Sequence, residues 1–421
     1  MRCSLCLLLT CFVVLSPFSV SEARRLGVTD DVAASEAASQ AVSAVNAFAI
    51  DVYRELAAGS DNIFFSPYSI SSALAMTYAG ARGDTAAEMA KALHFTENTP
   101  DIHAAMNSLQ RRFNSIPEES GTFSVANRLW LDKSEKLIPD YEALVVENYG
   151  AGVEPVDFKG AAESARMEIN DWVAEKTRDK IKHLLHQGDV TRDTNLILVN
   201  AVYFNSVWAR PFDKKNTREE PFRTGKDEQH NVPMMRQKGH YLYGENQDAQ
   251  WINVPYKIPG YSMLILLPRE NESFTQMEDF ERKLTVETLS LWISDMSGRE
   301  VELIMPKFKD ERRYPLTELL NKLGMNLAFT NDADFTGMVK DARKDGQVVK
   351  IDSVIHQAFI ELDEERTEAA AATAVVMMKA MALPPQEHIV FRADHPFIYC
   401  LVDDLGTVLF MGRINTINNA Q

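Results

Sequence analysis

The chain has 421 residues, of which 45% are hydrophobic and 25% charged, values typical of a globular protein with a large core. Its formal net charge of -16 argues against nucleic acid and anionic membranes as general partners, because a protein binds either of them through clustered Lys and Arg side chains. No internal repeat or low-complexity linker divides the sequence. We therefore expect a single domain over residues 24–421.

The first 23 residues have the pattern of a secretory signal peptide. Arg2 supplies a positive start, the apolar run from Leu7 to Leu15 is too short to span a membrane, and Ser21-Glu22-Ala23 offers a cleavage site. We therefore expect a secreted, extracellular protein. The triplet Asn271-Glu272-Ser273 is an acceptor for N-glycosylation, which agrees with secretion and predicts a glycoprotein.

Cysteine usage agrees with a fold that depends on its core. Three of the four cysteines lie in the leader, so the mature chain keeps only Cys400, within the apolar run Phe397 to Leu401. We expect Cys400 to be a buried, unpaired thiol.

Helical patterns dominate the first half of the chain. Amphipathic or alanine-rich helices are predicted over residues 33–58, 101–113, 138–148 and 161–184. Ser66-Pro67 opens a further helix, with proline at a position where its missing N–H does no harm. Thr85 and Glu88 have the spacing of a capping box for another short helix.

Strand patterns dominate after Thr194. The nearly continuous apolar run from Leu196 to Phe204 predicts a central strand buried on both faces. Residues 241–267, 301–305 and 389–411 are also strand-like. Because helices come first and strands later, the sequence predicts an α+β fold.

Three glycines mark predicted ends and turns. Ile258-Pro259-Gly260 predicts a turn in which glycine takes a positive φ, and Asp404-Leu405-Gly406 predicts a tight turn between strands. A helix from Leu316 to Leu323 should end at Gly324 in a left-handed cap.

Motifs of catalysis are lacking. The sequence contains no nucleophile elbow, zinc-protease helix or nucleotide-binding loop. His183 and His186 lack a third ligand nearby in sequence, and adjacent carboxylates in Asp363-Glu364-Glu365 would point to alternate faces of a strand. We therefore expect neither an enzyme nor a protein with a metal or cofactor.

The segment that begins at Thr367 is ambiguous between helix and strand. Its alanines favour helix, whereas its threonines and valines favour strand. Read with period two, one face is uncharged and carries Thr367, Ala369, Ala371, Thr373, Val375 and Met377. Such a segment could enter a sheet as an extra strand, although a surface helix remains an alternative on these residues alone.

Residues 364–376 resemble the hinge of inhibitory serpins. The hinge positions are Glu364, Glu365, Arg366, Thr367, Glu368, Ala369, Ala370, Ala371 and Ala372. The resemblance covers about residues 38–415, through motifs such as Asn62 to Ile70, Leu323-Gly324-Met325 and Asp394-His395-Pro396-Phe397. It implies the serpin fold, with three β-sheets, about nine helices and an exposed reactive-centre loop at about 364–388.

Membership of that family implies inhibition by a suicide-substrate mechanism. A serine or cysteine endopeptidase cleaves the loop, stays attached as an acyl-enzyme, and is carried away when the loop inserts into the main sheet. The resemblance further implies a buried polar cluster that governs sheet opening, formed by Ser66, Ser69, Asn200 and His356. Asn200 and Trp208 mark the breach, where the loop first enters.

The family's spacing of seventeen residues from Glu364 places the cleaved bond at Ala380-Met381. Alanine there suits elastase-like proteases with small apolar pockets. If the bait residue is Lys379 instead, the target is trypsin-like. Arg366 departs from the family, which usually has glycine at that position, and could slow the first step of insertion.

Two further interpretations stay open. A non-inhibitory serpin acting as carrier, chaperone or storage protein is the alternative function, although the inward hinge positions lack the bulky or charged residues expected of it. A glycosaminoglycan could bind Arg111-Arg112 or the cluster from Arg178 to His183, but both clusters are short. We expect a monomer whose partner is its target protease, held covalently.

Overall fold

The computed structural model describes residues 28–95, 102–114, 116, 121–150, 152–270, 276–344, 347–364 and 388–417. Nine α-helices lie in this part of the chain, as the sequence resemblance implies: α2 (Val28–Leu56), α3 (Pro67–Gly80), α4 (Gly83–Ala92), α5 (Ile102–Asn114), α6 (Pro139–Tyr149), α7 (Phe158–Lys176), α8 (Gln276–Lys283), α9 (Val286–Ser294) and α10 (Thr317–Lys322).

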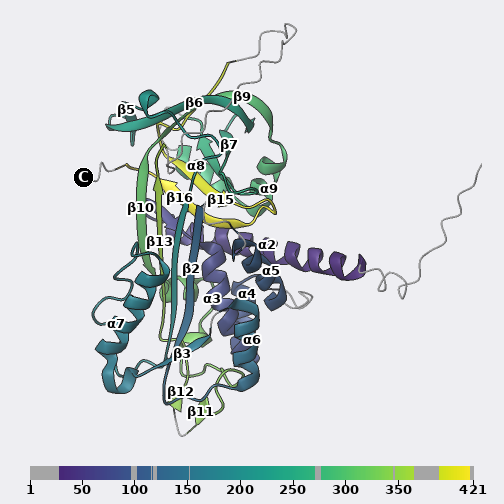
Figure 1. The fold of residues 1–421 in the computed structure, drawn as a ribbon, viewed down its shortest axis with the longest axis vertical. Coiled ribbons are helices and arrows are strands. Elements are labelled where there is room, and N and C mark those ends of the chain that lie inside the picture. The colour runs from purple at the N-terminus through teal and green to yellow at the C-terminus, as the bar shows by residue number, and fades with distance from the viewer. Residues whose placement is uncertain are drawn as a thin grey trace, which may run out of the picture.

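One large sheet has five strands in the order β10-β13-β4-β2-β3. Figure 1 shows these strands running along the length of the molecule, with α3 and α6 on one side and α7 on the other. Their bounds are β2 (Gly121–Asp132), β3 (Val153–Val156), β4 (Leu196–Ser206), β10 (Phe308–Pro315) and β13 (Ser353–Leu362).

A second sheet has nine strands, eight of them in the order β1-β16-β15-β8-β7-β6-β9-β14, with β5 paired to β6. Their bounds are β1 (Ile63–Phe65), β5 (Arg218–Arg223), β6 (Gln229–Glu245), β7 (Ala249–Pro255), β8 (Ser262–Pro268), β9 (Ser297–Pro306), β14 (Ile389–Arg392), β15 (Phe397–Val402) and β16 (Val408–Ile414). Strands β11 (Arg343–Lys344) and β12 (Gln347–Val348) form a separate short ladder.

The implied arrangement of three main sheets is not confirmed in the part of the chain described. The reason lies in β6, which is 17 residues long. Its first residues pair with β5, its last residues pair with β7, and β9 follows its other side from Met234 to Tyr243. One long strand therefore joins strands that would otherwise form two sheets.

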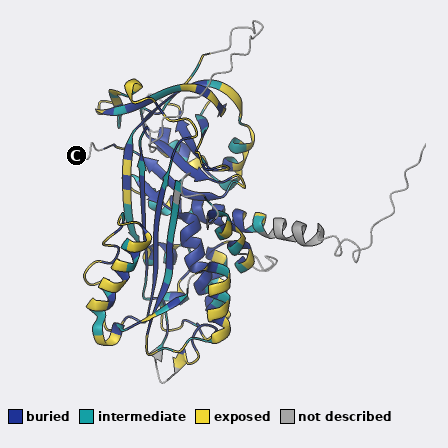
Figure 2. Ribbon diagram, in the orientation of Figure 1, coloured by how far each residue is buried: buried dark blue, intermediate teal, exposed yellow. Residues whose placement is uncertain are grey.

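The predicted central strand is confirmed as β4. Its first nine residues are buried, and alternate side chains enter two different cores. Leu196 and Leu198 belong to the main core, while Ile197 and Val199 pack in a smaller core that includes Phe158 of α7. Figure 2 shows the same sheet buried between helices whose outer faces are exposed. Burial on both faces explains the continuous apolar run.

Several local predictions are confirmed. Ser66 is the N-cap of α3, its side chain accepting from Ser69 N, and Pro67 is the first helical residue. Gly260 and Gly324 have φ values of +81° and +93°, which glycine adopts without steric cost. Cys400 is a free thiol with 0% exposure in β15.

The capping box at Thr85 and Glu88 is wrong. Helix α4 starts at Gly83, after Arg82, without a side-chain cap. The Thr85 hydroxyl accepts instead from Asp334 N at 3.0 Å, and a Glu88 carboxylate oxygen accepts from Asn326 N and Leu327 N, both at 2.7 Å. These residues satisfy backbone groups of a distant segment, a use that local spacing does not reveal.

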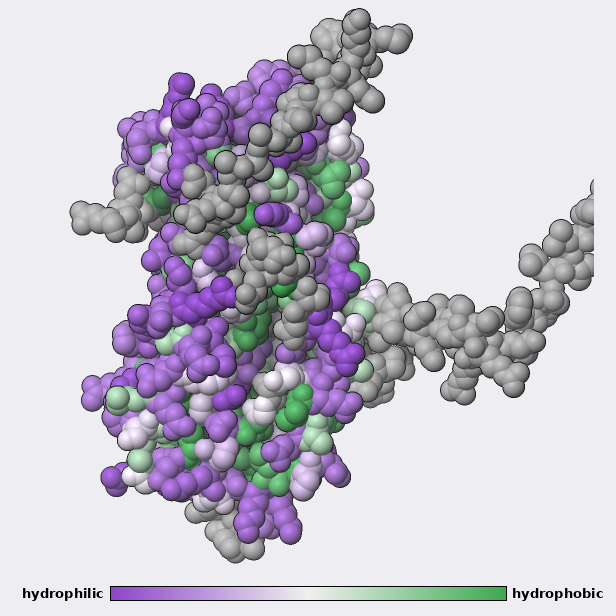
Figure 3. Space-filling model, in the orientation of Figure 1, coloured by the Kyte–Doolittle hydropathy of each residue, from purple (hydrophilic) through white to green (hydrophobic). Residues whose placement is uncertain are grey.

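The α+β prediction holds for the mixture of helices and sheets, but the order of elements differs from the expectation. Strands β1, β2 and β3 lie among the early helices. On the face shown in Figure 3, polar residues cover most of the surface and apolar residues are visible mainly in the lower half. Within the described residues, none of the helices combines the length and apolar character needed to cross a membrane.

Candidate functional site: the junction of β4 and β13

A row of polar side chains crosses the middle of the five-stranded sheet. The register places Tyr314 of β10 opposite His356 of β13, His356 opposite Asn200 of β4, and Asn200 opposite Asn127 of β2. His356 and Asn200 are 0% exposed, and Asn127 is 9% exposed. Because adjacent strands hold these positions side by side, their side chains can bond across the sheet.

The N-terminus of α3 completes this polar cluster, which consists of Ser66, Ser69, Asn127, Asn200 and His356. Ser69 Oγ donates to Asn127 Oδ1 at 2.8 Å and accepts from Asn200 Nδ2 at 2.7 Å. Asn127 Nδ2 donates to Ser69 O at 3.1 Å, and Ser66 Oγ donates to Leu409 O at 2.6 Å. The cluster therefore joins α3 to three strands and to β16.

The hydrogen bonds of His356 indicate a neutral ring with its proton on Nδ1. Ser66 N donates to Nε2 at 3.1 Å, so Nε2 carries no proton, and Nδ1–H donates to Asn200 Oδ1. Burial lowers the pKa of His356 to about 3, because a charged imidazolium would lose its hydration. A proton on Nε2 would also face the Ser66 N–H. The cluster is therefore intact only while His356 is neutral.

A second group of contacts lies where β13 leaves the sheet. Trp208 Nε1 donates to Asp363 O at 3.0 Å, and Phe212 N donates to Glu364 O at 3.0 Å. The Trp208 ring is stacked on Tyr256, with centroids 4.6 Å apart. These bonds fix the two residues that follow β13.

The Glu364 side chain is anchored as firmly as its backbone. It is 3% exposed; Thr217 Oγ1 donates to one carboxylate oxygen at 2.6 Å, and Lys307 Nζ lies 2.7 Å from the other. Burial by itself would raise the pKa of Glu364, but the bonds from Lys307 and Thr217 outweigh burial and hold the pKa below its usual range. The carboxylate is therefore charged at neutral pH.

The sequence comparisons identify the family of this chain. The model of the serpin family, described as serine protease inhibitors, matches residues 43–417. The chain belongs to the serpin family. Leukocyte elastase inhibitor A of Rattus norvegicus is 39% identical over 385 residues, covering 89% of this serpin and 99% of the relative. Leukocyte elastase inhibitor of Equus caballus is 41% identical over 379 residues, covering 88% and 97%.

Solved structures agree with the family assignment. Uncleaved ovalbumin matches this serpin with a TM-score of 0.78 at 29% identity, covering 89% of this chain and 99% of its own. Human thyroxine-binding globulin matches with a TM-score of 0.79 at 27% identity, covering 91% and 100%. The fold is therefore shared by serpins with differently named roles.

The structure brings together four predicted site residues of this serpin, Ser66, Ser69, Asn200 and His356, in one cluster. Trp208 lies apart from them, at the end of β13 beside Glu364. Asn127 is a fifth member that the sequence did not single out. The only sequence signal for it was a polar residue within the strand-like run Val125-Ala126-Asn127, and its partners became evident only from the register of β2 and β4.

Several other predicted positions lie outside the described residues. They are the leader at residues 1–23, the glycosylation acceptor Asn271, the hinge from Glu365 to Ala372, and the bait candidates Lys379, Ala380 and Met381. Among the described residues, no group of three or more His, Cys, Asp or Glu side chains is placed to hold a metal ion.

The two basic clusters considered for glycosaminoglycan binding lie near carboxylates. Arg112, near the end of α5, pairs with Asp404. Lys180 and Lys182 lie 4.0 and 3.8 Å from Glu361 and Asp179, respectively. Neither cluster therefore presents a continuous row of unpaired cations, which a polyanion requires.

Proposed function

We propose that this serpin is secreted, acts as a monomer, and inhibits a serine or cysteine endopeptidase by a suicide-substrate mechanism. A serine protease attacks the carbonyl carbon of Ala380 in the loop of residues 364–388. The Ala380–Met381 peptide bond breaks, the amine of Met381 leaves, and Ala380 stays esterified to the protease. The freed loop then inserts into the five-stranded sheet before water can cleave the ester.

The observation that carries this proposal is the parallel pairing of β4 and β13, from Ser353 opposite Ile197 to Ile360 opposite Phe204. The loop continues from the end of β13, at Glu364. A segment that turns back there runs antiparallel to β13 and, because β4 is parallel to β13, antiparallel to β4 as well. Insertion thus replaces one parallel pair with two antiparallel pairs, which are slightly more stable per residue.

The polar cluster supports a role in controlling this insertion. The His356–Asn200 hydrogen bond crosses the β13–β4 boundary and must break when a strand enters between them. Leaving buried donors and acceptors unpaired costs about 1–3 kcal/mol for each group. The closed sheet is therefore held until a cleaved loop supplies new partners.

The anchored Glu364 supports a fixed starting point for insertion. Its backbone and side chain are tied to Phe212, Thr217 and Lys307, so the turn back into the sheet begins immediately after it. The first residues to enter would then be the small ones after Arg366. Short side chains suit a strand that must pass between two strands already packed together.

Two features favour an elastase-like target. Relatives about 40% identical to this serpin are named leukocyte elastase inhibitors, and the seventeenth residue counted from Glu364 is Ala380, whose side chain fits a small apolar pocket. A trypsin-like target remains the alternative if the protease cuts after Lys379. Secretion rests on the pattern of residues 1–23.

The test is incubation of the purified mature protein with elastase-like, chymotrypsin-like and trypsin-like proteases. We expect a covalent complex on denaturing gels with the elastase-like enzyme, and mass spectrometry should locate the cut after Ala380. Cleavage by all three enzymes without a stable complex would contradict inhibition and favour a carrier, chaperone or storage role. Secretion is checked separately, by expressing the full chain in secretory cells and sequencing the N-terminus of the exported protein.

A further inference from the structure

A cavity of about 280 Å³ lies beside β2, on the side away from β4. Strand β3 pairs only with residues Leu129–Asp132 of β2, so the segment from Gly121 to Arg128 has no neighbouring strand on that side among the described residues. Helices α3, α5, α6 and α7 supply the remaining walls. The volume is close to the lower end of the ~300–1,000 Å³ range of small-molecule sites.

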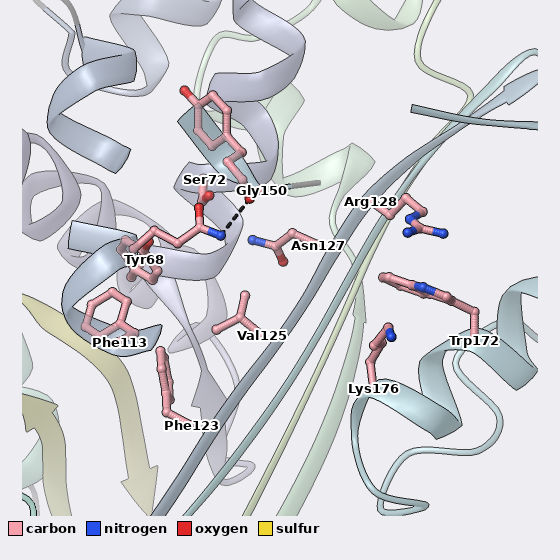
Figure 4. A pocket seen from close by; sticks show the side chains of 12 residues that line it. Tyr68, Ser72, Phe113, Phe123, Val125, Asn127, Arg128, Gly150, Trp172 and Lys176 are labelled. Carbon is pink, nitrogen blue, oxygen red and sulfur yellow. Dashed lines mark hydrogen bonds between the residues drawn. The ribbon is translucent and has the colours of Figure 1, made fainter. Parts of the chain in front are cut away.

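One half of this cavity is aromatic and apolar. Figure 4 shows Tyr68, Phe113, Val125 and Phe123 grouped on one side of it. The Tyr68 and Phe113 rings meet edge to face at 4.6 Å, and the Phe113 and Phe123 rings at 5.0 Å. These rings hold one another in place, so they form a preformed apolar wall.

The other half carries two cations and an indole ring. In Figure 4, Arg128, Trp172 and Lys176 lie together, across Asn127 from the aromatic wall. The Arg128 guanidinium lies over the Trp172 ring, 4.5 Å from its centroid. Stacking of this kind orients a guanidinium and leaves its in-plane N–H groups available.

The Arg128 guanidinium retains hydrogen-bond donor capacity. Its Nη1 donates to Glu154 Oε2 at 3.0 Å, its Nε is buried without a partner within the described chain, and Nη2 is the donor left for a ligand. Lys176 Nζ lies 2.8 Å from Glu175, in a surface pair whose lysine side chain is 46% exposed. Lys176 can therefore turn from Glu175 toward a ligand at little cost in free energy, since exposed ion pairs contribute little to stability.

The charges around the cavity indicate which class of ligand it can bind. Each cation already has one carboxylate partner, so the local net charge is small, and the whole chain carries -16. A polyanion is therefore disfavoured, whereas a single carboxylate can use the spare donors of Arg128 and place an apolar body against the rings. We propose that this cavity binds an organic monoanion with a flat aromatic body of one or two rings.

The test uses the mature protein and two ligands of the same shape, 2-naphthoate and its neutral analogue 2-naphthamide, in calorimetric titrations. Naphthoate should bind with a stoichiometry of one and about tenfold or more tighter than naphthamide, because a charge-assisted hydrogen bond contributes about 1.5–3 kcal/mol. Tryptophan fluorescence should change on binding, since Trp172 lines the cavity.

Variants assign the binding to this cavity. Arg128→Gln should weaken naphthoate about tenfold and leave naphthamide unchanged, and Lys176→Gln should weaken naphthoate about threefold. Arg299→Gln, which removes a positive charge from an exposed position on β9, is the matched control and should leave both affinities unchanged. If Arg128→Gln fails to fold, Lys176→Gln decides. Equal affinities for the two ligands, or unchanged naphthoate binding to the folded variants, would overturn the proposal.

Discussion

His356 is the titratable residue on which the polar cluster depends. It accepts from Ser66 N and donates to Asn200, and the bond from Ser66 N requires the neutral ring. Its low pKa ties the stability of the sheet to pH.

We expect the free energy of unfolding to fall as the pH drops from about 6.5 toward 3. In this window unfolded His356, with an ordinary pKa near 6.5, takes up a proton that the folded residue, with a pKa of about 3, does not. One proton corresponds to a slope of at most about 1.4 kcal/mol per pH unit. Thermal unfolding of the native protein and of His356→Gln over pH 4–7 measures it. Identical pH slopes for the two proteins would contradict the assignment.

Cys400 is predicted to be chemically inert in the folded chain. Burial raises its pKa to about 12, so almost no thiolate is present near neutral pH. At pH 8 we expect no labelling by iodoacetamide over an hour in native buffer, and complete labelling in concentrated denaturant, as measured by mass spectrometry. Rapid labelling of the native protein would show that β15 opens or that the thiol is accessible.

At the scale of elements, the proposed mechanism requires the hinge segment to fit as a strand between β4 and β13. The period-two pattern after Arg366 places Thr367 on the uncharged face and Glu368 on the opposite one. Only the uncharged face can be buried when the segment enters the sheet.

Thr367→Arg should therefore convert the inhibitor into a substrate. A buried arginine without a partner opposes the first step of insertion, so the ester is hydrolysed before the loop enters. The yield of covalent complex per cleaved inhibitor, read from denaturing gels, should fall about tenfold or more. Glu368→Arg places the same charge on the outer face and should keep most of the complex. Equal yields from the two variants would show that the alternation does not matter.

Features that depend on neighbouring residues were predictable from the sequence. Hydrogen bonds to segments far along the chain were not. The cap at Ser66 and the turn at Gly260 follow from neighbouring residues, and both were predicted. Thr85, Glu88 and Asn127 instead bond to segments far along the chain. The cavity beside β2 escaped notice for the same reason, because Arg128 and Trp172 come together only when α7 packs against β2.

At the scale of the whole molecule, the proposed mechanism requires the five-stranded sheet to accept a sixth strand. At the parallel pair β4–β13, a strand that turns back after Glu364 can run antiparallel to both neighbours. Under the proposed mechanism, the uncleaved fold stores free energy that cleavage of the loop releases.

Cleavage within the loop should therefore raise the melting temperature, by about 10 °C or more if a full strand inserts. The reason is that the inserted strand gains antiparallel partners on both sides and buries its uncharged face. Differential scanning calorimetry before and after limited proteolysis at residues 379–381 measures the change, with uncleaved protein held under the same conditions as the control. An unchanged or lower melting temperature would indicate that the cleaved loop stays outside the sheet.

The pairing of β4 with β13 also bears on the order in which the five-stranded sheet assembles. His356 and Asn200 are 156 residues apart in sequence, whereas Asn200 and Asn127 are 73 apart. Contacts between distant residues form slowly, because the loop between them must close before any pairing compensates its lost entropy. The β4–β13 pair is therefore expected to form after the β2–β4 pair, and until it forms the facing edges of β4 and β13 are both unpaired.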